Sequence, residues 1–209
     1  MISSTHIRSL VVAFVLTGAP CAALADRGAF TLDAGFFSGF ESASPGVGSG
    51  SAVSRASWGG LLGARYAVFN DLELTGTALY QAPVDYSHPN TTVTLATKTG
   101  AYTGTGTLQT RVSSWGITAG ARWVHGVVWR YFAGGEFGFA NRSFSDLDFM
   151  GFPLADSSTA TALLVPVAGI EWDPTDHFSL GLSVRAQMYL GEPSGVQMLV
   201  PLTLSYAWY

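Results

Sequence analysis

The sequence predicts an all-β fold, a closed antiparallel transmembrane β-barrel with eight strands, and three observations lead to this class. Only 11% of the 209 residues are charged while 48% are apolar, and the mean hydropathy is +0.29, whereas a soluble domain carries about a quarter charged residues. Apolar and polar residues alternate with period two over long segments, as they do along a strand with two different faces. No run of about 18 apolar residues is present, so a membrane-spanning helix is not predicted.

Residues 1–25 have the pattern of a secretory signal peptide. His6 and Arg8 precede an apolar stretch, and an Ala-Leu-Ala sequence that ends at Ala25 provides a cleavage site. We therefore expect residues 26–209 to form a single exported barrel domain. Cys21 lies within the removed segment. It would be a lipid attachment site in a lipoprotein, but Gly18 stands where such a signal carries an aliphatic residue, which favours simple cleavage.

The clearest strand covers residues 178–190. Its apolar side consists of Phe178, Leu180, Leu182, Val184, Ala186, Met188 and Leu190. The residues between them are polar or small, with Arg185 the charged one. Strands of soluble proteins cluster near 5 to 6 residues, whereas a strand tilted across a bilayer needs about 9 to 11. The length of this segment favours a strand that crosses a membrane.

Seven further segments repeat the pattern, and each is followed by residues that favour turns. They cover residues 30–41, 55–68, 72–82, a segment that ends at Trp123, a segment that begins at Trp129, 160–172 and 198–208. With the strand at 178–190, this makes an even number of strands.

The links between these strands alternate in length. Short links cover residues 69–71, 124–126 and 173–177, whereas the links at 42–54, 83–107, 141–157 and 191–195 are mostly longer and richer in Gly, Ser, Thr, Asn and Pro. Bacterial outer-membrane barrels have short periplasmic turns and long extracellular loops. The sequence therefore predicts a protein of the bacterial outer membrane, with both termini in the periplasm and surrounded by membrane lipids.

Aromatic side chains gather at both ends of the predicted strands. Trp123, Trp129, Trp172, Phe178 and Trp208 lie at the short-link ends, and Trp58, Tyr80, Trp115 and Phe139 lie near the long-link ends. Trp115 and Trp123 are eight steps apart on one strand, which is roughly 20 Å of height for a tilted strand. Two such groups match the aromatic girdles at the interfaces of a membrane.

A secreted soluble barrel or sandwich is the alternative fold. Its apolar faces would point inward, and it would need a polar outer face. The second face of these strands is rich in Gly, Ser and Thr and is sparsely charged, as the crowded interior of a narrow closed barrel would be. The composition of that face favours the membrane barrel.

The charged residues of the strands fall on the non-lipid face and predict a charge network that fills the lumen. Its members are Asp33, Arg65, Glu73, Arg122, Arg130 and Glu171 near the short-link ends, and Glu136 and Arg185 higher up, where they would meet across the lumen. This set is neutral, which matters because an unpaired buried charge is costly. We therefore expect no open aqueous pore; a polar relay or gated path for small solutes is the alternative.

The long link at 83–107 has a pattern of its own. From Thr91 to Thr110, threonine occurs at nearly every second position, interrupted by Lys98-Thr99-Gly100. This pattern predicts that the two flanking strands continue above the membrane as a hairpin. An additional strand pair in the wall, giving ten strands, is the alternative. A protruding strand edge would allow a partner to bind by strand addition.

From residue 26 to Tyr209 the chain resembles the small eight-stranded bacterial outer-membrane proteins of the OmpA transmembrane-domain, OmpX and OmpW type, in architecture rather than in a diagnostic motif. The resemblance implies recognition by the barrel assembly machinery through a last strand that ends in an aromatic residue. Here the apolar alternation ends on Trp208 and leaves Tyr209 out of phase. That family includes adhesins, structural anchors and conduits for apolar compounds, so the resemblance selects no single function.

Catalysis, cofactors and metals have little support in the sequence. Lipid-modifying barrels of this architecture use a Ser and a His near the outer rim, but Ser87 and His88 are adjacent, and His125 and His177 lie in short links. An Asp-x-Asp at 146–148 lacks the further ligand spacing of a calcium loop. The absence of a basic run argues against nucleic acid. We expect a monomeric structural or surface-interaction protein without cofactor; a solute conduit and, more distantly, a lipid-modifying enzyme are the alternatives.

Overall fold

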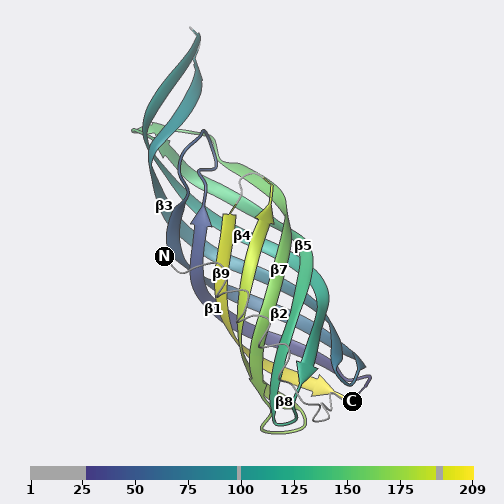
Figure 1. Cartoon of the computed structure of the whole chain (residues 1–209). Coiled ribbons are helices and arrows are strands. Elements are labelled where there is room, and N and C mark those ends of the chain that lie inside the picture. Colours follow the sequence, from purple (N-terminus) through teal and green to yellow (C-terminus); the bar gives the residue numbers. More distant parts are fainter. Residues whose placement is uncertain (1–26, 98–99, 192–194) are drawn as a thin grey trace, which may run out of the picture.

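The computed structural model describes residues 27–97, 100–191 and 195–209, and it shows an elongated barrel with a hairpin that rises beyond one rim (Figure 1). The signal peptide expected at residues 1–25, including Cys21, lies outside the described residues. Among the described residues, no helix has the length and apolar character needed to cross a membrane.

Nine strands follow one another along the described chain. They are β1 (Phe30–Ala43), β2 (Val53–Phe69), β3 (Leu72–Thr97), β4 (Gly100–His125), β5 (Trp129–Phe149), β6 (Phe152–Pro153), β7 (Ser157–Trp172), β8 (Phe178–Leu190) and β9 (Gly195–Trp208). Eight of them form the wall, and the two-residue β6 is attached to the end of β5.

The wall is a closed ring in which every neighbouring pair is antiparallel. Each wall strand pairs with the next wall strand along the chain, including β4 with β5. The ring closes where β1 pairs with β9. The closing pair runs from Phe30 opposite Trp208 to Ala43 opposite Gly195. Closure gives every strand of the wall a partner on both sides, which lipid requires because it cannot hydrogen-bond to a free strand edge. The predicted fold class, with eight rather than ten wall strands, is confirmed.

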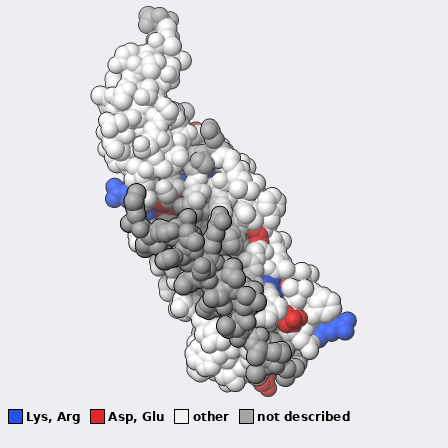
Figure 2. Space-filling model, viewed as in Figure 1, with Lys and Arg blue, Asp and Glu red and all other residues white. Residues whose placement is uncertain are grey.

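The two faces of the wall are inverted relative to a soluble protein. Along β8 every second residue is apolar and points out, so that Leu182 is 49% exposed, while Arg185 on the same strand points in and is 6% exposed. On the face in view in Figure 2, charged atoms are sparse among uncharged ones. An apolar exterior of this extent needs an apolar solvent, because soluble monomers rarely expose such large continuous patches. The barrel therefore spans a membrane.

The aromatic residues singled out in the sequence all lie on the exposed outer face. These are Trp58, Tyr80, Trp115, Trp123, Trp129, Phe139, Trp172, Phe178 and Trp208. Trp129 and Trp172 stack at the short-turn end with ring centroids 6.0 Å apart, and Trp115 and Phe139 form an edge contact of 5.6 Å toward the opposite rim. Their contact with membrane interfaces stays a prediction.

The expectation that residues 141–157 form a loop was wrong, because β5 continues to Phe149. The reason is that the solvent around the outside of the barrel changes from lipid to water beyond the rim. Within the membrane the apolar side chains of β5 point out, as Phe139 does, whereas beyond the rim Phe144 and Phe149 point in and are buried. Apolar residues occupy the inner face from Phe144, and a bulge at Asp146, where φ is +50° and the register with β4 shifts, then changes which residues of the strand point inward. Both changes interrupt the alternation that marks the strand.

The buried apolar side chains beyond the rim form one cluster, here called the rim core. It consists of Ala43, Tyr86, Val93, Leu108, Val112, Phe144, Leu147 and Phe149. The cluster joins β1, β3, β4 and β5 above the membrane-spanning part. It covers the lumen on the long-loop side.

The hairpin predicted within residues 83–107 is confirmed. β3 and β4 pair with each other up to Thr97 opposite Gly100, with register shifts near Gln81 and His88. On the exposed face of this hairpin, the hydroxyl of Thr92 bonds that of Thr105, and Thr94 bonds Thr103, each at 3.0 Å. The threonine repeat thus forms a ladder of cross-strand pairs.

Candidate functional site

The candidate site is the lumen, where polar side chains lie in three layers along the barrel. The lowest layer, at the short-turn end, consists of Asp33, Arg65, Glu73, Arg122, Arg130, Glu171 and Asp173. Its residues belong to or directly follow β1, β2, β3, β4, β5 and β7, so its ion pairs connect strands from around the ring. We call it the lower cluster.

Arg65 is the hub of the lower cluster. Its guanidinium lies 2.6 Å from a carboxylate oxygen of Asp33, 3.3 Å from one of Glu73 and 3.1 Å from one of Glu171. The side chain is 4% exposed. A planar fork of donors fits such a site, because it bonds several carboxylates in one plane.

Two further arginines complete the lower cluster. Arg122 binds Glu73 at 2.7 Å and Glu171 at 2.8 Å, and its guanidinium carbon lies 4.2 Å from the centroid of the Phe132 ring. Arg130 binds Glu171 at 3.0 Å and also reaches Asp173 at 2.6 Å. Each carboxylate of the layer therefore has at least one arginine beside it.

The middle layer is a single ion pair with hydroxyl partners. Glu136 of β5 binds Arg185 of β8 across the lumen, and both side chains are buried. The carboxylate of Glu136 also accepts hydrogen bonds from Thr75 and Thr77, each at 3.2 Å, and from Thr118. A cavity of about 40 Å³ separates this pair from the lower cluster.

The upper layer lies below the rim core and centres on Glu41. Its carboxylate binds Arg142 at 2.6 Å and accepts hydrogen bonds from Gln81 at 2.6 Å and Tyr86 at 2.8 Å. The Arg142 guanidinium also lies 4.6 Å from the centroid of the Tyr189 ring. Burial, followed by the charge of Glu41, raises the pKa of Tyr86, so its hydroxyl keeps its proton and donates.

Amides extend this upper network to β2, β4, β8 and β9. Gln197 of β9 donates to Gln81 at 2.9 Å and to Ser57 of β2 at 3.0 Å, and its own oxygen accepts from Tyr189 of β8 at 3.1 Å. Ser114 of β4 donates to Gln81 at 3.0 Å. Polar groups from opposite sides of the ring thus meet in the middle of the lumen.

The structure brings together every lumen charge singled out in the sequence, six of them in the lower cluster and two in the middle pair. Sequence reasoning missed Glu41, Arg142 and Asp173. Glu41 is the last residue of the expected strand 30–41 and has the same parity as Asp33, so that strand already placed it on the inward face. Arg142 has the same parity as Glu136, so continuing the alternation past the expected strand end would have found it. Asp173 stood in a predicted short link.

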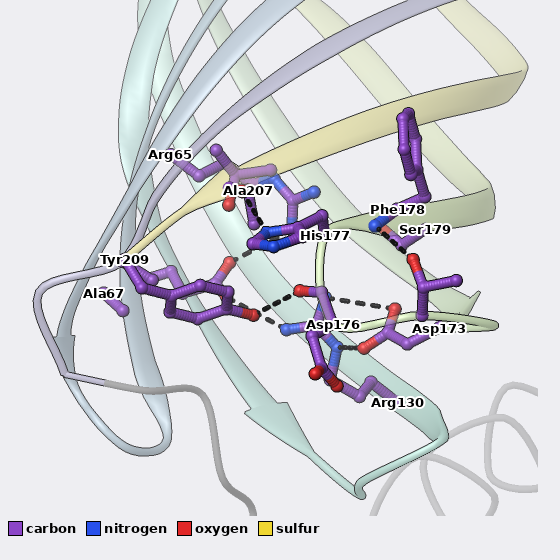
Figure 3. Close-up of a pocket in the computed structure, with 14 residues that line it drawn as sticks. Arg65, Ala67, Arg130, Asp173, Asp176, His177, Phe178, Ser179, Ala207 and Tyr209 are labelled. Carbon is purple, nitrogen blue, oxygen red and sulfur yellow. Dashed lines mark hydrogen bonds and ion pairs between the residues drawn. The ribbon is translucent and has the colours of Figure 1, made fainter.

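A small cavity of about 50 Å³ opens at the short-turn end (Figure 3). Arg65 and Arg130 line it together with Asp173, His177 and Tyr209. The Tyr209 hydroxyl donates to the Asp176 carbonyl at 2.5 Å. Burial, and secondarily the nearby Glu171 carboxylate, raises the pKa of Asp173, opposed by Arg130. The space holds a few waters rather than a larger ligand.

The three described histidines, one of which catalysis would need, lie in three different environments. His88 is buried beneath the hairpin with its ring 5.8 Å from that of Tyr86. At the short-turn end, opposite to His88, His125 stacks on Trp123 and His177 stacks on Tyr206. Asp146 is paired with Arg111 at 2.7 Å. Within the described ranges, no three His, Cys, Asp or Glu side chains are grouped so as to hold a metal ion.

A closed ring of eight tilted strands with an apolar exterior and a polar, ion-paired interior defines a small transmembrane β-barrel. Solved structures with this fold include Ail, the attachment invasion locus protein of Yersinia pestis, at 15% identity over 87% of this chain and 99% of Ail, with a TM-score of 0.53. Neisserial surface protein A is 14% identical over 86% of this chain and 99% of its own, with a TM-score of 0.55.

The outer membrane protein OprG of Pseudomonas aeruginosa is 14% identical over 90% of this chain and 100% of its own, with a TM-score of 0.52. No family model and no curated protein matches the chain. At these identities the likeness concerns the fold, and at that level it confirms the resemblance to the small outer-membrane barrels drawn from the sequence.

Proposed function

We propose that this protein is an integral barrel of the bacterial outer membrane that acts as a rigid, non-conducting mount for a surface-interaction element. Residues 1–25 direct its export, the short turns face the periplasm, and the rim core with the β3–β4 hairpin faces the outside. The assignment of sides follows the general rule that outer-membrane barrels keep short turns in the periplasm and longer loops outside.

The observation that carries this proposal is the filled lumen. Three polar layers and the rim core occupy successive heights of the barrel, and the ion pairs of Arg65, Glu136 and Arg142 join strands from different sides of the ring. An eight-stranded barrel is just wide enough to be filled by side chains. A continuous water path would require several of these buried pairs to separate, at a cost of several kcal/mol for each.

The part beyond the membrane supports the surface role. The rim core anchors a hairpin whose outer face carries exposed threonines instead of charges. Ail is by name an attachment protein, and it has also been crystallised with the heparin analogue sucrose octasulfate. For the present chain we extend only the general role of surface attachment, without that ligand.

Three further parts of the proposal concern assembly and chemistry. The barrel assembly machinery recognises β9, whose exposed aromatic Trp208 stands at its end. The protein functions as a monomer within its own membrane, since the closed wall offers no unpaired strand there.

It is not an enzyme, because Ser87 and His88 are neighbours whose side chains differ in burial and lack a described orienting acid.

Planar-bilayer recording of the refolded full-length mature protein tests the proposal. We expect heat-modifiable gel migration, which reports the folded barrel, and no steady single-channel conductance. We expect Arg185→Ala to lower stability without opening a steady conductance, since two polar layers remain. Steady conductance of the unmodified protein, altered by Arg185→Ala more than stability is, would instead establish the conduit. A change in the mass of lipid A on expression would establish a lipid-modifying enzyme.

A further inference from the structure

The two edges of the β3–β4 hairpin are covered to different heights. The β3 edge carries Pro89 and a register shift between His88 and Thr91, and Thr92 on that edge pairs with Ser49 of the β1–β2 loop. The pairing of β4 with β5 ends at Leu108 opposite Phe149. Just beyond that point the Thr107 carbonyl still accepts from the Met150 N–H at 3.4 Å, and over residues 101–106 no described strand pairs with the outer edge of β4.

The hydrogen-bond pattern identifies the backbone groups on this bare edge. Both the N–H and the carbonyl of Thr92 bond to Ser49, at 2.8 and 3.0 Å, so they point away from β4. In an antiparallel pair, opposite residues either exchange both bonds or neither. Thr105, opposite Thr92, and Thr103, opposite Thr94, therefore direct their N–H and carbonyl groups to the outer edge of β4.

The bare edge also lacks the features that usually prevent pairing. Residues 101–106 contain neither charge nor proline, whereas exposed edges are usually interrupted by Lys, Pro, bulges or covering loops. Tyr102 beside this edge is 62% exposed, as is Met150, which contacts Gly106 from the end of β5. Two large apolar side chains are therefore available above the membrane next to unpaired backbone groups.

We infer that this edge pairs with the same edge of a second copy of the chain, in an antiparallel register centred on Gly104. The sequence around that centre is self-complementary. Thr103 of each copy lies opposite Thr105 of the other, and these are the residues whose backbone groups point outward, so each of the two pairs exchanges two hydrogen bonds. Tyr102 lies opposite Gly106, where an aromatic ring covers a cross-strand glycine.

The pairing extends contacts that the single chain already makes. Thr92 and Thr105, and Thr94 and Thr103, are bonded through their hydroxyls on one face of the hairpin, and the second copy continues the same threonine ladder across four strands. On the other face, Tyr102 of one copy reaches Met150 of the other, which covers both exposed apolar side chains.

The direction of the strands determines where the second copy lies. The hairpin rises beyond the rim along the length of the barrel (Figure 1). Two copies in one membrane point the same way, so their β4 strands run parallel to each other. Antiparallel pairing needs an inverted copy, which only a facing membrane supplies. The inferred interaction is thus contact between two cells that both carry the protein; each pair is small and gains strength from many copies.

Docking of protein-bearing vesicles tests this inference. The mature protein is reconstituted into two vesicle populations of neutral phosphatidylcholine that carry a donor or an acceptor lipid dye. We expect energy transfer when both populations carry the protein, and none when one population is bare. The inference rests on the proposed surface role, so heat-modifiable migration and conductance are measured on the same preparations, which separates a failure of the barrel from a failure of pairing.

Proline variants provide a matched comparison. Thr103→Pro and Thr105→Pro each remove an N–H that points to the bare edge but bonds nothing in β3, so the fold is retained. Thr94→Pro removes an equivalent outward N–H from the opposite edge of the same ladder, the β3 edge, which the inferred pairing does not use. We expect docking to fall about tenfold or more in the first two variants and to stay unchanged in Thr94→Pro.

Three results would overturn the inference. They are no docking between populations that both carry the folded protein, equal docking to bare vesicles, which assigns the edge to lipid, and unchanged docking in Thr103→Pro and Thr105→Pro.

Discussion

Glu41 on β1 and Arg142 on β5 form an ion pair of 2.6 Å across the top of the lumen, and neither side chain has any exposed surface. The two residues are 101 positions apart in the chain. The pair closes the polar interior directly below the rim core, whose members Ala43 and Phe144 lie two residues further along the same strands. It therefore couples the membrane-spanning wall to the part of the protein outside it.

Removal of one partner of this pair should be costly. We expect Arg142→Met to lower the free energy of unfolding by about 3 to 5 kcal/mol, because it leaves the Glu41 carboxylate buried without its cation. Urea unfolding in detergent micelles measures this loss. The double variant Glu41→Gln, Arg142→Met should lose clearly less, since no charge remains to be solvated. Equal losses in the two variants would mean that the charge of Glu41 is not the cause.

The lower cluster should respond similarly at Arg65. We expect Arg65→Met to destabilise the barrel by several kcal/mol, because Asp33, Glu73 and Glu171 all lose a buried partner. Arg111→Met is the matched control, since Arg111 also pairs with two carboxylates but is 46% exposed; its loss should not be measurable in salt. Similar effects of the two substitutions would contradict a special role for the lumen.

The hairpin should be dispensable for folding. Replacement of residues 92–105 by an Asn-Gly turn keeps the Thr91 and Gly106 pair and supplies a tight hairpin connection. We expect heat-modifiable migration to persist, with a modest loss of stability because Val93 leaves the rim core. Failure of this variant to fold in micelles would show that the upper part of β3 and β4 is needed to build the wall.

His88 should make the stability of the protein sensitive to acid. Burial lowers the pKa of His88, opposed by a contact of its Nδ1 with the Ser51 carbonyl. Below the ordinary value of about 6.5, the unfolded chain binds a proton that folded His88 does not, so stability present above that pH is lost as pH falls through it.

Unfolding midpoints at pH 8 and pH 5.5 measure this effect, and His88→Gln is the comparison. We expect the drop in stability between the two pH values to be smaller in His88→Gln than in the unmodified protein. An identical drop in both proteins would assign the pH dependence to other groups.

The strands and the lumen charges of the lower and middle layers could be predicted because they follow one simple rule. Inside a bilayer the outward residues are apolar and charged residues are confined to the inward face, so strand parity alone places Asp33, Glu73 and Arg185 in the lumen. Arg142 escaped prediction because it lies where the outer solvent changes from lipid to water. There Phe144 turns inward, and the alternation no longer distinguishes the two faces.

Composition and period-two alternation by themselves determined a membrane-spanning barrel and its charged interior, and they favoured eight strands with a protruding hairpin, because each is a local consequence of which solvent a side chain meets. Only the tertiary structure decided which charges meet which, since Glu41 and Arg142 become neighbours through closure of the ring. It also decided which hairpin edge stays bare. That depends on where the β1–β2 loop and the end of β5 pack, and such contacts between distant segments leave no periodic trace in the chain.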